Sequence, residues 1–244
     1  MKLTVRLTIV SILVLILLGA LYFLFPSKWQ SVYYDLMNEN PSINSVEEFR
    51  DIYNGFEKAQ AHQLPIHYQE KSLLNSSKFQ KLTQKVLYVV IPKRQVYQKV
   101  AGHVRWVDLI CKDELFKNAG FWKNETVYCG INPKVVEKLI LLQNALKEHD
   151  YDPNALTVKS GHRTPLKNQQ AGGAGLSRHI AGEAIDIRIG DINQDGKYTD
   201  DDKQIVLDLC EKQIIKNEGG IGLYPGTRSV HIDVRGHRAR WDSY

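Results

Sequence analysis

The sequence predicts a chain of mixed helices and short strands that follows an apolar N-terminal segment. Apolar residues recur at helical spacing along residues 133–149, whereas residues 155–159 and 229–235 have the pattern of short strands. Residues 7–25 form an apolar run about long enough to span a bilayer core of roughly 30 Å as a helix. The 244 residues, 43% of them hydrophobic, suffice for one good-sized domain with additions.

The N-terminal run predicts a membrane anchor over residues 1–26. Lys2 and Arg6 precede the run, and its end lacks the small residues that mark a signal-peptide cleavage site. We therefore expect a single-pass protein with its N-terminus in the cytoplasm and the rest of the chain outside it, in the periplasm or on the cell-wall side. A cleaved signal peptide is the alternative.

The charge bears on possible partners of the chain, and the cysteines bear on possible disulfides. The formal net charge is +5, but no run of Lys and Arg is dense enough to predict a nucleic-acid partner. In an exported protein Cys111 and Cys129 are a candidate disulfide, with three free thiols as the alternative. Cys210 lies on an apolar helix face and is expected in the core.

Residues 27–104 carry no catalytic signal and are interpreted as a membrane-proximal stalk or accessory region. Ser45 and Glu48 have the spacing of a capping box, which predicts a helix to about residue 60. Residues 87–91 have the pattern of a strand. The remaining residues, 105–244, carry the chemical motifs, and a helix there starts at Asn132 followed by Pro133.

Two histidines and an aspartate in this second part suggest a metal centre. His179 and Asp186 lie close together, and His231 follows in a predicted strand. Two imidazoles and one carboxylate can hold zinc with a fourth position open to water, which suits hydrolysis. A guanidinium beside a zinc site can grip a substrate carboxylate with paired hydrogen bonds, and Arg163, which follows a short predicted strand, is the candidate for this role. A structural role of Arg163 in tying down its own loop is the alternative. Packed or exposed positions are expected for four other histidines: His103, His149, His162 and His237.

Residues 191–202 resemble a twelve-residue calcium loop inserted in this domain. Oxygen ligands would come from Asp191, Asn193 and Asp195 and from the backbone carbonyl of Lys197, with Gly196 at the turn position. Asp202 stands at the twelfth position, where Glu is usual. An acidic turn that caps the following helix is the alternative.

The residues around His179 resemble a known family. Ser177, His179, Gly182, Ala184 and Asp186 match the S-x-H-x-x-G-x-A-x-D motif of the zinc D-alanyl-D-alanine carboxypeptidases, peptidoglycan peptidases that share their fold with the hedgehog signalling domain. The resemblance extends over about residues 106–244. Its other supporting segments are Ser160 to Pro165, Asn168, Gly172 and Gly173, Gly219 to Tyr224, Val230 to Arg235, and Trp241.

The resemblance implies an α+β fold, with a small antiparallel sheet and helices packed on one side. It implies zinc at His179, Asp186 and His231, a substrate carboxylate at Arg163, and cleavage of amide bonds next to D-amino acids in stem peptides or cross-links. Peptidoglycan peptides are then the expected partner.

One departure from the family bears on catalysis. Many relatives carry Glu three residues before the last zinc ligand, or His two before it, but here Arg228 and Ser229 stand there. Asp233 shares a strand face with His231 and becomes the candidate general base, with Glu183 as the other nearby acid. A wall-binding module that holds zinc and calcium without cleaving, and a calcium-stabilised domain without zinc, remain the rival hypotheses. The sequence predicts no oligomeric state.

Overall fold

The computed structural model describes residues 41–111 and 126–242. Its main sheet has five strands in the order β10-β8-β9-β7-β6, antiparallel except where β10 runs parallel to β8. The strands of this sheet are β6 (Leu156–Ser160), β7 (Ala184–Ile189), β8 (Gly220–Gly222), β9 (Ser229–Asp233) and β10 (Ala239–Trp241).

Register in this sheet places two predicted metal ligands side by side. β7 is an interior strand between β9 and β6, and five of its residues pair with β9 so that Asp186 lies opposite His231. On its other edge β7 pairs with β6, where an irregularity after Val158 leaves Ser160 opposite Asp186. Side chains of directly opposite residues in an antiparallel pair share one face of the sheet. The two ligands therefore meet through strand pairing.

A second, three-stranded antiparallel sheet has the order β1-β2-β5, and a two-stranded sheet pairs β3 with β4. The strands are β1 (Glu57–Gln60), β2 (Leu87–Pro92), β3 (Lys99–Ala101), β4 (Val104–Arg105) and β5 (Thr126–Cys129). Through the β2–β5 pair, the region interpreted as a stalk or accessory region shares a sheet with residues of the following domain. Residues 42–104 and the described residues of the following domain belong to the same compact unit.

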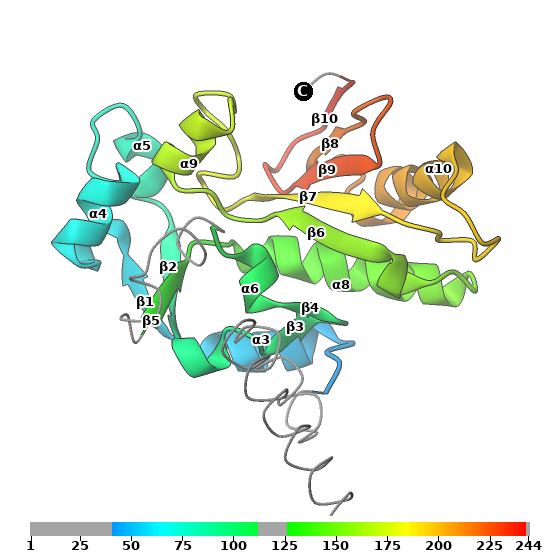
Figure 1. Cartoon of the computed structure of the whole chain (residues 1–244), viewed down its shortest axis with the longest axis horizontal. Helices are drawn as coiled ribbons and strands as arrows, with labels where there is room; N and C mark the ends of the chain where they lie inside the picture. Colours follow the sequence, from blue (N-terminus) through cyan, green and yellow to red (C-terminus); the bar gives the residue numbers. More distant parts are fainter. Residues whose placement is uncertain (1–40, 112–125, 243–244) are drawn as a thin grey trace, which may run out of the picture. The chain divides into compact units, whose positions relative to one another are not determined.

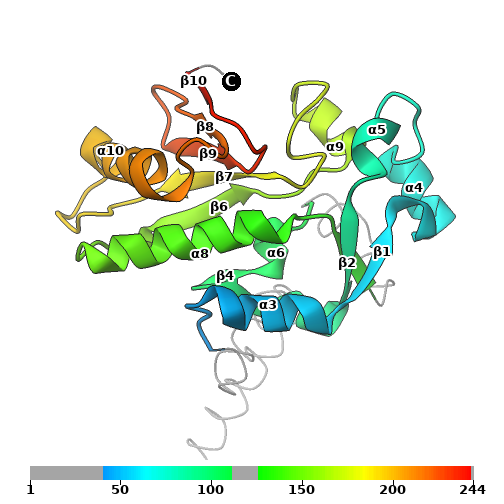
Figure 2. The same ribbon diagram turned by 180° about the vertical axis from the view of Figure 1, so that it is seen from behind.

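Helices cover these sheets, and the longest of the described ones, α8 (Pro133–Glu148), runs along one side of the five-stranded sheet with α3 (Val46–Gly55) beyond it (Figures 1 and 2). Residues 41–111 and 126–242 also contain the helices α4 (Ile66–Ser72), α5 (Gln80–Thr83), α6 (Trp106–Leu109), α9 (Pro165–Gln170) and α10 (Asp200–Leu209), the 3₁₀ turns η1 (Ala61–Gln63), η2 (Lys93–Gln95) and η3 (Pro153–Ala155), and the π turn η4 (Cys210–Ile214).

Local signals explain how α8 and α3 begin. The Asn132 side chain accepts the N–H of Lys134, and Pro133 occupies the first turn, where its missing N–H costs nothing. The capping box of Ser45 and Glu48 is present at the start of α3. That helix ends at Gly55 and not near residue 60, because the chain turns into β1.

Among the described residues, no helix is long and apolar enough to cross a membrane. The apolar run predicted as an anchor, residues 1–26, lies outside the described residues.

The disulfide expected between Cys111 and Cys129 is absent: both are buried thiols, as is Cys210. Cys129 ends β5 opposite Val89 of β2, whereas the sulfur of Cys111 lies 4.0 Å from the hydroxyl of Thr164. The two cysteines thus belong to different local environments, and the spacing argument for a bridge was wrong.

Candidate metal centre

His179 lies in the turn before β7, where backbone contacts fix the turn. Its carbonyl accepts N–H groups from Arg163 and Gly182, and the carbonyl of Gly182 accepts the N–H of Asn132. Gly182 has φ +70°, and a Cβ there would lie 1.7 Å from the carbonyl oxygen of Gly130. The glycine of the motif is therefore required by a close backbone approach.

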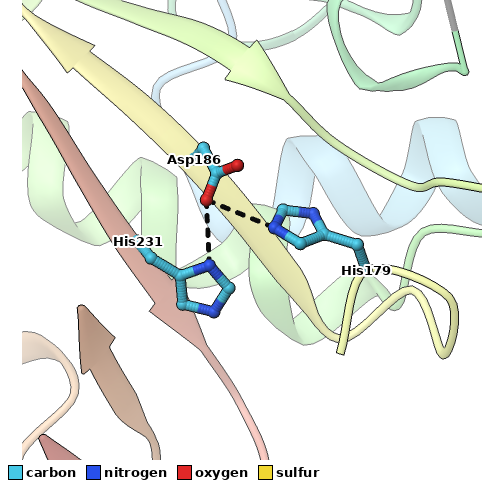
Figure 3. Close-up of side chains that lie close together, drawn as sticks. All are labelled: His179, Asp186 and His231. Carbon is cyan, nitrogen blue, oxygen red and sulfur yellow. Dashed lines mark hydrogen bonds and ion pairs between the residues drawn. The ribbon is translucent and has the colours of Figure 1, made fainter. Parts of the chain in front are cut away.

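The side chains of His179 and His231 both point toward the carboxylate of Asp186 (Figure 3). Oδ1 of Asp186 lies 3.2 Å from Nε2 of His179 and 2.9 Å from Nδ1 of His231. All three residues are buried. Among the described residues, this is the one group of three or more His, Cys, Asp or Glu side chains whose ligand atoms lie within 4.8 Å of one another.

In each histidine, the inner ring nitrogen faces Asp186 and the outer one faces away from it. The hydrogen bonds of the outer nitrogens explain why the inner nitrogens can bind a cation. Nδ1 of His179 lies 2.8 Å from the carbonyl oxygen of Gly161, which can only accept, so that nitrogen carries the proton. Nε2 of His231 lies 3.3 Å from a carboxylate oxygen of Asp233 and donates to it. Each imidazole can therefore turn a lone pair towards Asp186, and a metal ion between the three acceptors satisfies all of them.

The distances also suit zinc. With metal–ligand distances of about 2.0–2.1 Å, two ligand atoms of a tetrahedral zinc lie roughly 3.3 Å apart. The two contacts of Asp186, at 3.2 and 2.9 Å, are close to this separation. The donor set, two imidazoles and a carboxylate, is one that zinc prefers. The residues present therefore fit the metal that the sequence predicted.

Burial and mutual contact shift the pKa values of the three side chains. Burial alone would raise the pKa of Asp186, but its hydrogen bonds with His179 and His231 lower it well below the usual range. Burial lowers the pKa of His179. Burial also opposes protonation of His231, but its contacts with Asp186 and Asp233 outweigh burial and raise its pKa. A metal ion would displace the proton held there.

Arg163, the predicted substrate-binding residue, contacts the other oxygen of Asp186. Its Nη2 donates to Oδ2 of Asp186 at 2.6 Å, and its Nε donates to Ser160 at 2.8 Å. Its side chain is 19% exposed. Arg163 thus lies beside the metal centre, as predicted, and its first partner there is a ligand carboxylate.

Asp233, the candidate general base, lies behind His231. Its side chain is fully buried and contacts the outer nitrogen of His231, whereas Asp186 faces the inner nitrogen. Both of its oxygens accept hydrogen bonds from Arg235. Burial would raise the pKa of Asp233, but the contacts with His231 and Arg235 lower it well below its usual value. Glu183, the other acid considered, forms an ion pair with Arg178 at 2.9 Å.

In the loop predicted to bind calcium, the carboxylates accept hydrogen bonds from backbone N–H groups of the loop itself. Asp191 accepts the N–H groups of Asp195 and Gly196, and Asp195 accepts that of Lys197. Asp202 is fully buried and accepts the N–H groups of Ile192, Asn193 and Thr199, which caps α10. This arrangement matches the alternative of a capped acidic turn, and calcium binding stays a prediction.

Three residues from the motif segments contact the centre, although the sequence assigned them no role there. The Gly161 carbonyl acts through its backbone, for which side-chain identity gives no signal. Trp241, in the three-residue strand β10, packs its ring 5.1 Å from that of His231. Arg235 follows His231 and Asp233 at alternate positions, and that spacing was the available signal.

Comparison with known proteins agrees with this geometry. A family model described as Peptidase M15 matches residues 110–233, just over half of the chain. The matched segment contains all three residues of the metal centre. No curated protein matches the chain significantly.

Proposed function

The chain belongs to the peptidase M15 family of zinc-dependent peptidases, and on that premise we propose that it hydrolyses amide bonds next to D-amino acids in peptidoglycan stem peptides or cross-links. The observation that carries this proposal is the convergence of His179, Asp186 and His231, with the outer nitrogen of each imidazole already hydrogen-bonded. Such preorganised ligands suit a catalytic zinc, which leaves a coordination position for solvent or substrate.

When bound, zinc would polarise the scissile carbonyl and lower the pKa of a water molecule towards about 7. The protein residues hold the reactants in place. Within the described residues, the hydrogen bonds of Arg163 engage its Nε and Nη2 and leave Nη1 available to a substrate carboxylate. A guanidinium fixed in this way would position the peptide relative to Asp186 at little entropic cost.

The proposed location follows from the N-terminal run. An uncleaved anchor over residues 1–26 would hold the domain on the outer side of the membrane, in the periplasm or facing the wall, where peptidoglycan is the abundant peptide with D-amino acids. Fractionation with protease protection of the domain tests this location separately from the chemistry.

One observation favours a second candidate function. Arg228 and Ser229 occupy the positions where many relatives carry an acid or a histidine, and Asp233 is enclosed. A domain with this arrangement could bind zinc and stem peptides without cleaving them, as a cell-wall-binding module.

Incubation of full-length protein with purified peptidoglycan and with synthetic stem peptides tests the proposal. We expect new amino termini or released D-alanine, detected by mass spectrometry, and loss of product with a chelator or in His179→Ala. Release of terminal D-alanine alone indicates a carboxypeptidase, and cleaved cross-links indicate an endopeptidase. Zinc-loaded wild type that binds peptidoglycan without forming product would overturn the enzyme in favour of the binding module.

A further inference from the structure

The residues behind His231 form a second layer of the metal centre. We propose that Asp233 and Arg235 are positioning residues, which hold His231 through its outer nitrogen in the orientation that binds zinc, and that Asp233 is not the general base. This inference rests on the zinc site of the proposed function. It does not depend on which bond, if any, the protein cleaves.

The carboxylate of Asp233 is enclosed on every side that the structure describes. Oδ1 accepts the backbone N–H groups of Gly220 at 2.9 Å and Arg235 at 3.1 Å. Oδ2 faces Nε2 of His231 at 3.3 Å, and the residue is 0% exposed. A general base must come within about 2.6–3.2 Å of the atom whose proton it takes. Asp233 lacks that access, because the imidazole of His231 separates it from Asp186.

Arg235 holds this carboxylate in a paired contact. Its Nη2 donates to Oδ2 at 2.6 Å and its Nε to Oδ1 at 2.9 Å. Isolated buried carboxylates are costly, and removal of one partner of a buried ion pair leaves an uncompensated charge. The planar fork of Arg fits a carboxylate with two parallel hydrogen bonds, which Lys cannot reproduce. Arg235 therefore fixes both the charge and the direction of Asp233.

Close packing of Gly220 and Trp241 restricts the positions of Asp233 and His231. A Cβ at Gly220 would lie 2.3 Å from Oδ2 of Asp233, so only glycine leaves room for the carboxylate. The indole of Trp241 lies under the guanidinium of Arg235, 5.0 Å from the ring centroid, and beside the ring of His231. Trp241 in the short strand β10 thus packs against both Arg235 and His231, the two residues that Asp233 connects.

The two imidazoles of the centre differ in what orients them. A backbone carbonyl, that of Gly161, holds His179, whereas side chains hold His231. Substitution of Asp233 or Arg235 can therefore weaken the hold on His231 without changing the hydrogen bond that orients His179. Removal of outer-layer partners of metal ligands typically lowers metal affinity by about 10- to 100-fold.

Zinc affinity of the full-length protein, measured by competition with a chelating indicator, tests the proposal without substrate. We expect the zinc dissociation constant to rise about 10- to 100-fold in Asp233→Asn and in Arg235→Gln, and to rise less in Arg235→Lys, which restores the charge. Arg238→Gln is the matched control, because Arg238 lies in the same C-terminal segment and pairs with Glu211 at 3.1 Å. Wild-type zinc affinity in both Asp233→Asn and Arg235→Gln would overturn the proposal.

Nuclear magnetic resonance of ¹⁵N-histidine-labelled, zinc-saturated protein provides a readout that a purely structural role would not change. In wild type we expect the Nε2 proton of His231 to resonate far downfield, as a proton donated to a carboxylate, and to shift upfield in Asp233→Asn. Arg235→Gln provides the same test should Asp233→Asn fail to fold. An unchanged resonance in a folded variant would contradict the proposal. If the variants lose zinc affinity as expected but the zinc-loaded wild type has no peptidase activity, that result would instead contradict the proposed function.

Discussion

The zinc centre and the loop 191–202, two metal sites suggested by residue spacing, differ in what their carboxylates contact. In the zinc centre, Asp186 faces two imidazole nitrogens while other groups hold the outer atoms of those rings. In the loop, Asp191, Asp195 and Asp202 accept backbone N–H groups of the loop itself. Metal-ligand spacing alone does not separate these cases. Acceptor atoms that face one another identify the candidate site.

The largest expected difference between the two regions concerns zinc binding itself. His179→Ala, which leaves two ligands, should reduce zinc from one ion per chain to none, because an open site requires three protein ligands. Asp195→Asn in the loop should leave zinc content unchanged. Metal analysis after gel filtration measures both variants, and His179→Ala with full zinc content would contradict the assignment.

The next largest effect is a difference in the free energy of unfolding between alanine substitutions at two glycines with positive φ. Gly182→Ala places a Cβ 1.7 Å from the carbonyl oxygen of Gly130, so we expect a loss of about 3 kcal/mol or more in the free energy of unfolding. Gly196 of the loop has φ +93°, and a Cβ there would meet no atom within 4 Å, so Gly196→Ala should lose only about 1–2 kcal/mol through backbone strain. Urea unfolding of both variants checks the order, and equal losses would refute it.

The two regions should also lose stability in different pH ranges. Burial lowers the pKa of His162, next to Gly161, from 6.5 to about 3, so between those values the unfolded chain binds a proton that the folded chain does not. The free energy of unfolding should therefore fall on acidification through this window, by up to about 1.4 kcal/mol per pH unit.

His162→Phe, which keeps a ring against Tyr88, should flatten this dependence between pH 6 and 4.5, whatever its effect on absolute stability. The slope isolates the titration of this one side chain, since His179 and His231 remain in both proteins. Burial would raise the pKa of Asp202, but the N–H groups of Thr199 and other backbone donors lower it, so its contribution is lost only below about pH 4. An unchanged slope in His162→Phe would rule out the assignment.

The smallest expected effect concerns the cap of α10. Asp202→Asn should lower the free energy of unfolding by about 1 kcal/mol in calcium-free buffer, because the charge of the capping-box carboxylate that accepts the Thr199 N–H is lost. Thermal unfolding with chelator and with added calcium measures this. If the variant differs from wild type only when calcium is present, Asp202 acts as a metal ligand, contrary to the capped-turn interpretation.

Sequence signals predicted those parts of the fold that depend on neighbouring residues. Asn132 with Pro133, and Ser45 with Glu48, identified where α8 and α3 begin, because caps act within one turn. The strands β1 and β10 were missed, since four and three residues are too few for a periodic pattern. β10 is defined by its pairing with β8, a contact that no local signal reveals.

The same limit applies to the site. Residue types and motif order predicted that His179, Asp186 and His231 would form one cluster, and the structure brings them together. Orientation depends on tertiary contacts, such as the Gly161 carbonyl and the Gly220 N–H, which have no side-chain signature. For that reason the sequence could place Asp233 on the face of His231, but it could not distinguish a base from a buried partner.

The most direct test of the account is the location of zinc by anomalous X-ray diffraction from crystals of the zinc-loaded protein. We expect a single strong peak bound by Nε2 of His179, a carboxylate oxygen of Asp186 and Nδ1 of His231, with Nε2 of His231 still hydrogen-bonded to Asp233. A peak elsewhere, or ligation of zinc by Nε2 of His231, would contradict it.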